Sequence, residues 1–171
     1  HPEAFNAGAY LRWLETFADY RATCLFASAP DRYGDGPETL RVAADVLPLI
    51  RDAGYPAALV AHPGCEDGID WSAFDVLFIG GPDWWQRSNA VDNLGREADR
   101  RGMPRHKGRV NSALRIRAAG IAGYDSVDGT FSGFGPDRNL PQVLSWLNEA
   151  RAQMVMPLWP DHCWRRAEET G

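Results

Sequence analysis

The sequence has little cysteine: Cys24, Cys65 and Cys163 are widely spaced, and no Cys-x-x-Cys pair occurs. Distant thiols in odd number argue against a disulfide framework and against a zinc site, so isolated thiols in a reducing compartment are the simpler interpretation. No apolar run approaches the roughly 20 residues that a membrane-spanning helix needs. We therefore expect no metal, no membrane partner and a cytoplasmic location.

An excess of positive charge is also absent, since the formal net charge is −5. This balance argues against a protein that coats nucleic acid without specificity. Basic residues nevertheless concentrate in one region, namely Arg96, Arg100, Arg101, Arg105, Lys107, Arg109, Arg115 and Arg117. Interleaved Glu97 and Asp99 are consistent with a solvated helix face, whereas the strand-end position of Lys107 favours a phosphate-facing patch.

Apolar residues recur at helical spacing in five segments and also form five short apolar runs. The expected helices cover residues 7–20, 36–54, 89–101, 112–122 and 140–152, and Pro48 is expected to kink the second. The expected strands cover residues 23–29, 56–61, 75–79, 105–110 and 124–127. Short apolar strands separated mostly by helices are typical of a parallel sheet built from βα units.

Such units either close into a barrel or form an open, doubly wound sheet. No phosphate-binding loop and no Gly-x-Gly-x-x-Gly fingerprint follows the first strand, which favours the barrel. The chain opens at His1 with neither a methionine nor a leader, so we expect a natural start further upstream. We expect an α/β fold: a TIM-barrel-like (β/α) parallel barrel over residues 1–153 that lacks its N-terminal strand or strands, and a tail over 154–171.

Residues capable of chemistry follow the expected strands, at the carboxyl ends where parallel α/β folds build their sites. These residues are Asp31, Asp35, His62, Gly80, Gly81, His106, Lys107, Arg109, Asn111, Asp125 and Asp128. Two carboxylates beside a sugar C1′ atom can carry out glycosyl transfer, one as nucleophile and the other in handling protons. Paired glycines let backbone amides approach a planar ligand, and basic side chains bind phosphate.

The most specific motif is residues 123–128, GYDSVD, which has the pattern Gly-x-Asp-x-x-Asp. Residues 108–129, which contain this motif, resemble the final βαβ unit of the tRNA-guanine transglycosylase superfamily. The longer segment, from HKGRVNS to GFGPDRNLPQVLSWL, is typical of one branch of that superfamily. The likeness is to the phage and actinobacterial branch of queuine tRNA-ribosyltransferase-like proteins, and it covers about residues 10–147. It implies an enzyme that replaces guanine by a 7-deazaguanine in DNA or tRNA.

The resemblance also implies roles for individual residues. Asp128 matches the nucleophile that attacks the ribose. Asp125, in the same motif, is interpreted as an orienting or structural carboxylate more than as a second catalyst. The implied base-binding residues are Asp31, which resembles the carboxylate on the guanine edge, His62, where the family usually has a glutamine, and Gly80 and Gly81. Lys107 and Arg109 would bind phosphates of the nucleic acid.

Two departures from the family pattern affect the prediction. The upstream strand with the proton-handling carboxylate is absent, and the structural zinc motif has no match, because His162 and Cys163 stand alone. We therefore expect no metal and no cofactor. The expected partners are a nucleic acid and a guanine-type base in a bacterial or phage-infected cell, and a homodimer stays open because superfamily members are often dimers.

Several of these residues also have a structural interpretation. Asp128 can form a turn with Gly129, and Asp31 fits a cap and a base-binding residue equally well. Asp35 is favoured as the cap of the helix that Pro37 begins, with a substrate role second. Asn111 is favoured as a helix cap over a ligand, and His106 as a satisfied polar residue over a catalyst. The adjacent tryptophans at 84 and 85 fit stacking on a base and covering a barrel mouth equally well.

The sequence also allows two functions from other classes. A phosphosugar isomerase or lyase on the same barrel would use Lys107 as its base or Schiff-base residue. A non-catalytic barrel would bind nucleic acid without turnover, and its binding would weaken with added salt.

Overall fold

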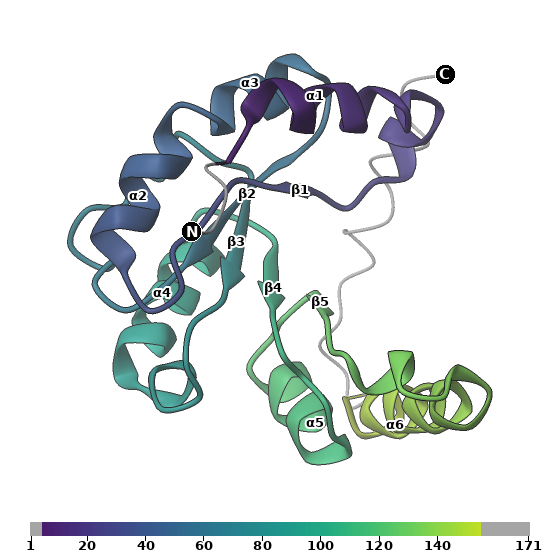
Figure 1. The fold of residues 1–171 in the computed structure, drawn as a ribbon. Helices are drawn as coiled ribbons and strands as arrows, with labels where there is room; N and C mark the ends of the chain where they lie inside the picture. The colour runs from purple at the N-terminus through teal and green to yellow at the C-terminus, as the bar shows by residue number, and fades with distance from the viewer. Residues whose placement is uncertain (1–4, 155–171) are drawn as a thin grey trace. The chain divides into compact units, whose positions relative to one another are not determined.

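The structure is a computed structural model that describes residues 5–154, so the expected tail from residue 155 onward lies outside the described residues. The chain divides into two compact units, which meet in the sequence between Gly108 and Arg109. Both units combine helices with β-structure, and the protein has an α/β fold (Figure 1). No helix within residues 5–154 combines the length and apolarity that crossing a bilayer would require.

The first unit contains four parallel strands in a single sheet. They are β1 (Ala27–Ser28), β2 (Ala57–Ala61), β3 (Val76–Ile79) and β4 (Arg105–Lys107). Each strand pairs with the next one in the sequence, and Leu59, Leu77 and Arg105 stand side by side across the last three strands. Sequential order is that of a βα barrel, whereas a doubly wound sheet reverses its order at a switch point. Parallel strands are thus confirmed, and closure into a barrel stays a prediction.

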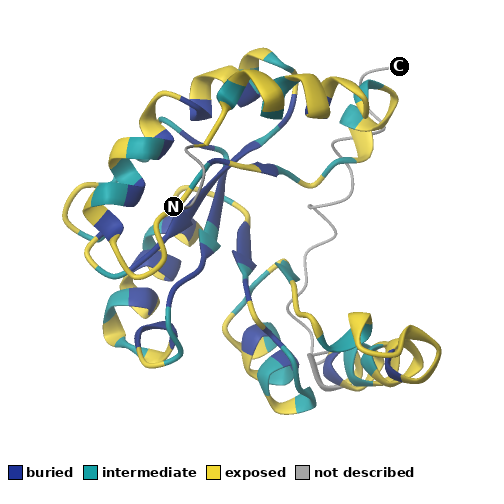
Figure 2. Ribbon diagram, viewed as in Figure 1, coloured by how far each residue is buried: buried dark blue, intermediate teal, exposed yellow. Residues whose placement is uncertain are grey.

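Helices of the first unit cover one face of this sheet. They are α1 (Ala7–Glu15), α2 (Gly36–Ala44), α3 (Leu47–Asp52) and α4 (Asn89–Arg100), with the short 3₁₀ helices η1 (Ala18–Thr23) and η2 (Trp85–Arg87). Figure 2 shows the strands as the most continuously buried part of the unit. Leu59, Leu77 and Ile79 are buried on the helix-covered face, where Arg105 meets Asp99 of α4 at 2.7 Å.

The prediction of a single helix over residues 36–54 was wrong, because the segment forms two helices, α2 and α3. Pro48 lies in the first turn of α3, where its missing N–H would have no helical partner in any case. It therefore begins a new helix and does not kink a continuous one. Residues 18–23 likewise form η1 and not the end of the first helix or the start of a strand.

The opposite face of the sheet carries a cluster of rings. The His106 ring lies 4.4 Å from the Phe78 ring and 4.9 Å from the Phe26 ring, centroid to centroid. Both contacts are edge-to-face, which suits the quadrupoles of aromatic rings. His106 is buried and packs as part of this cluster.

Strand β1 stands at one edge of the first unit's sheet, and side chains cover one of its carbonyls and the carbonyl of the residue before it. The Tyr10 hydroxyl donates to the Ser28 carbonyl at 2.9 Å, and the Cys24 thiol donates to the Phe26 carbonyl at 3.4 Å. An aromatic-lined cavity of about 650 Å³ lies between α1, η1 and β1. Covering an edge in this way discourages pairing with another strand.

The second unit consists of α5 (Ala113–Ile121), β5 (Ser126–Val127), the 3₁₀ helix η3 (Phe131–Gly133) and α6 (Pro136–Met154). Its buried core contains Val110, Ile116 and Ala150, and the partly buried residues packed against them are Val127, Val143, Trp146 and Leu147. The Ser112 side chain accepts a hydrogen bond from the Arg115 N–H, so Ser112 is the cap of α5. Helix α6 begins at Pro136, four residues before the expected start, because proline suits a first helical turn.

Candidate functional site

The candidate site in the first unit centres on a carboxylate and an imidazole. Asp31 follows β1 and His62 follows β2, so both lie at the carboxyl ends of neighbouring parallel strands. Asp31 Oδ2 lies 2.7 Å from His62 Nε2. The imidazole is 2% exposed and the carboxylate 40% exposed, so Asp31 alone presents itself to solvent.

The hydrogen bonds of His62 define its tautomer. The backbone N–H of Gly34 donates to His62 Nδ1 at 3.1 Å, which requires a lone pair on that nitrogen. The proton therefore sits on Nε2 and is donated to Asp31. Asp31 accepts this hydrogen bond, and the lone pairs of a carboxylate are acceptors for the donors of a ligand.

Two side chains, Thr39 and Asp35, hold the loop between β1 and α2 in place by hydrogen bonds to the backbone. The Thr39 hydroxyl accepts from the Arg32 N–H at 2.8 Å and donates to the Arg32 carbonyl at 3.1 Å. Asp35 caps α2 by accepting from the Glu38 N–H at 3.0 Å, which accounts for this residue structurally. Thr39, which is fully buried, was missed in the sequence because a single threonine within a helix carries no signal.

Packing explains the glycine pair that ends β3. A Cβ at Gly80 would lie 2.8 Å from Val60 Cγ1 and 3.2 Å from the His62 ring. Gly81 has φ +76°, and its Cβ would lie 2.9 Å from the Trp85 ring. Both positions thus need glycine without any ligand, and their expected contact with a base stays a prediction. Because Gly80 has no side chain, the His62 ring can pack closely against the backbone at the end of β3.

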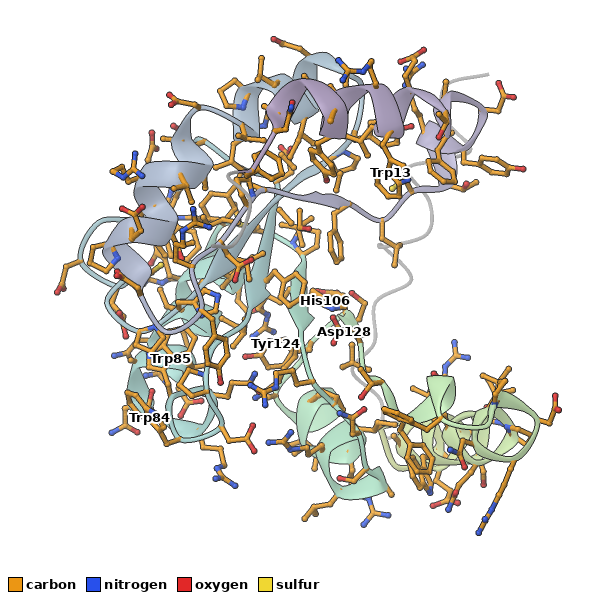
Figure 3. All side chains as sticks on the ribbon, in the orientation of Figure 1. Trp13, Trp84, Trp85, His106, Tyr124 and Asp128 are labelled. Atoms are coloured by element: carbon orange, nitrogen blue, oxygen red, sulfur yellow. The ribbon has the colours of Figure 1, made fainter. Side chains whose placement is uncertain are left out.

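The two adjacent tryptophans have different surroundings (Figure 3). Trp85 is buried, and its indole N–H donates to Glu66 Oε1 at 2.8 Å. Trp84 is 66% exposed. Of the two, Trp84 is therefore the one that could stack on a planar ligand.

Gln86 ties together the ends of β3 and β4. Its amide nitrogen lies 3.3 Å from the Gly81 carbonyl and 3.4 Å from the Gly108 carbonyl, and the side chain is buried. The Lys107 ammonium donates to the backbone carbonyl of Gln86 at 3.2 Å. A phosphate that binds Lys107 would either replace this hydrogen bond or use another of the three ammonium protons. Sequence reasoning missed Gln86, because only the fold brings it to the strand ends.

The candidate nucleophile belongs to the second unit. Asp128 is exposed, and its Oδ1 accepts from the Arg109 N–H at 2.7 Å. The Asp128 carbonyl accepts from the Val110 N–H at 2.6 Å. Arg109 has φ +64°, a left-handed conformation that is uncommon outside glycine. The motif therefore holds Asp128 against a strained turn of the chain.

Neighbouring residues fix the loop that carries Asp128. Asn111 Oδ1 accepts from the Phe131 N–H at 2.9 Å, so Asn111 ties two loops together and Ser112 is the cap. A Cβ at Gly129 would lie 2.4 Å from the Val110 carbonyl oxygen, which leaves room only for glycine. Asp125 is exposed one residue before β5.

Ion pairs account for part of the basic region. Glu97 of α4 pairs with Arg100 and with Arg101, and Asp99 pairs with the buried Arg105. These pairs fit the interpretation of a solvated helix face for that part of the region. Lys107 and Arg109 are the expected phosphate-binding residues that lie beyond α4.

Within the described part of the chain, no group of three or more histidine, cysteine or carboxylate side chains is placed to hold a metal ion. Cys65 is buried, and burial raises the pKa of its thiol to about 11. No protein-family model matches the chain, and comparison with curated proteins and with solved structures gives no match. The site is therefore interpreted from its own residues and from the motif around Asp128.

Proposed function

We propose that the protein exchanges a guanine base in a nucleic acid for a 7-deazaguanine. The observation that carries the proposal is the Asp31 carboxylate, held 2.7 Å from His62 Nε2 at the carboxyl ends of β1 and β2. The Gly-x-Asp-x-x-Asp motif that ends in Asp128 supports it independently.

Asp31 has the chemistry needed to recognise guanine. The Watson–Crick edge of guanine presents an N1–H and an exocyclic amino group side by side, and both are donors. A carboxylate is an acceptor with two oxygens, so it can accept both hydrogen bonds. A 7-deazaguanine has the same edge, which explains how one carboxylate would serve the outgoing and the incoming base.

Asp128 is proposed as the nucleophile. One carboxylate oxygen forms a bond to C1′ of the target nucleotide, and the C1′–N9 bond breaks with its electron pair going to guanine, which takes up a proton. The incoming base then loses its N9 proton, bonds to C1′ and releases the Asp128 carboxylate. The Arg109 N–H on Oδ1 would orient the carboxylate for the attack.

The target nucleotide must leave its stack before C1′ and the base edge become accessible. Lys107 and Arg109 are proposed to bind the flanking phosphates, which would hold the opened strand. The exposed ring of Trp84 could stack on a base in the same strand.

Labelled guanine offered with duplex DNA and, separately, with tRNA tests the proposal. We expect label to enter one polymer and to be lost in the Asp128→Asn variant. No label in either polymer, with binding that weakens as salt rises, would overturn the proposal in favour of a non-catalytic binding barrel. Turnover of a small phosphosugar that is lost in Lys107→Ala would overturn it in favour of an isomerase or lyase.

A further inference from the structure

We propose that His62 is a positioning residue: it does not contact the base, and it determines base selection by holding Asp31 and the loop that follows β1. This inference rests on the proposed function. It departs from the sequence-based expectation that His62 itself binds the base.

Burial is the first argument. The His62 side chain is 2% exposed, and Gly80 lets the β3 backbone approach its ring closely. The Tyr33 ring packs edge-on to the imidazole, with centroids 5.8 Å apart. A ligand at the strand ends would thus meet Asp31 or Tyr33, which are exposed, before it could reach His62.

The second argument is that one imidazole holds both ends of a tight loop. Nε2 bonds to Asp31 at the beginning of the loop, and Nδ1 accepts from the Gly34 N–H three residues later. Thr39 holds the backbone of Arg32 between them. Removing the imidazole would take away the donor that holds the Asp31 carboxylate and would free the Gly34 end of the loop.

The consequence concerns selectivity. With His62 in place, the Asp31 carboxylate is held in one orientation, so it favours a base with two adjacent donors. Hypoxanthine lacks the exocyclic amino group and offers only N1–H at this edge. A rigid carboxylate distinguishes the two bases better than a rotating one, because a rotating side chain can adapt to a single donor.

Nitrogen-15 NMR of the histidine side chains tests the positioning directly, without any activity. We expect His62 as the Nε2–H tautomer, with an Nε2 proton resonance that shifts in Asp31→Ala. An Nδ1–H tautomer, or a His62 resonance that does not respond to Asp31→Ala, would overturn the inference even if the protein exchanges bases.

The preference for guanine over hypoxanthine, as a ratio of kcat/KM values in the exchange assay, tests the effect on selection. We expect His62→Leu to lower the ratio about tenfold, the size of one lost hydrogen bond to a charged group. His62→Gln keeps a donor near the Nε2 position, so its ratio should lie close to that of the wild-type protein. Val91→Ala, a cavity variant in α4, controls for simple destabilisation and should leave the ratio unchanged.

The two proposals fail in different ways. An unchanged ratio in an active His62→Leu variant would overturn the positioning role alone. No exchange in the wild-type protein would overturn the proposed function, while the NMR result would still decide whether His62 holds Asp31.

Discussion

The backbone N–H of Arg109 donates a 2.7 Å hydrogen bond to Oδ1 of Asp128. The donor belongs to a residue at φ +64°, and the Arg109 carbonyl accepts from the Arg115 guanidinium at 2.7 Å. The second unit thus orients its motif carboxylate through main-chain geometry.

Asp128→Asn should abolish base exchange with little change in stability. The asparagine oxygen can still accept from Arg109, whereas the neutral amide is a poor nucleophile toward C1′. Asp128→Ala should abolish exchange and also lower the free energy of unfolding by about 1 kcal/mol through the lost hydrogen bond. Label incorporation and urea unfolding measure the two effects. Full exchange activity in the asparagine variant would refute the nucleophile assignment.

Arg109→Gly should affect stability and nucleic-acid binding in opposite directions. Glycine adopts a positive φ without strain, so we expect a gain of up to about 1 kcal/mol in the free energy of unfolding. If the side chain binds phosphate, affinity should fall and the slope of log K against log salt should decrease by about one. Thermal unfolding and salt titrations of binding measure these effects. An unchanged salt slope would remove Arg109 from the phosphate contacts.

Asp75→Asn should destabilise the first unit at neutral pH but not in acid. Burial opposes ionisation of Asp75, but hydrogen bonds from Arg51 and the Ala57 N–H and the charge of Arg51 outweigh it, so its pKa lies below the ordinary value. Stability from a lowered carboxyl pKa is present above the unfolded pKa of about 3.9 and is lost as pH falls through the folded pKa.

The expected loss in Asp75→Asn is about 1 kcal/mol at pH 7, because the carboxylate is 41% exposed and screened by solvent. Urea unfolding of both proteins between pH 7 and pH 3 measures it. The difference in unfolding free energy should shrink toward pH 3, and a difference that stays constant across this range would contradict the explanation. Asp52→Asn, next to Arg51 in the last turn of α3, is a control for the loss of one negative charge.

Cys65 should resist alkylation in the folded protein. Burial raises the pKa of its thiol to about 11, so roughly one thiol in a thousand is ionised at pH 8. Cys24 is only half-buried and should react first. Iodoacetamide labelling followed by peptide mass spectrometry compares the two, and equal rates in folded protein would contradict the burial of Cys65.

Gln86→Leu should destabilise the strand ends. The substitution removes the donor that Gln86 offers to the carbonyls of Gly81 and Gly108, at a cost of about 1–3 kcal/mol if either carbonyl stays buried and unsatisfied. The exposed neighbour Arg87→Leu is the matched control and should change the free energy of unfolding by less than about 0.5 kcal/mol. Equal effects of the two substitutions would argue against the bridging role.

The repeating apolar pattern determined the α/β class. The apolar runs at 57–61 and 76–79 form β2 and β3, and helical spacing placed α4 and α5 to within a residue or two. These elements follow from local propensity and burial, which the sequence encodes over a few residues. Asp35 was also assigned correctly as a cap, since capping is a local interaction.

Only the tertiary structure decided what the polar residues do. Asp31 and His62 stand 31 positions apart in the sequence, and their contact exists because β1 and β2 pair in one particular register. Thr39 and Gln86 could not be identified from the sequence for the same reason. The partner of Thr39 lies in the loop before α2, and those of Gln86 are Gly81 and Gly108, which follow β3 and β4. The sequence by itself determined which segments form helices and strands and which residues could do chemistry. The pairing of distant segments decided which of those residues meet, because hydrogen-bond partners are set by distance in space.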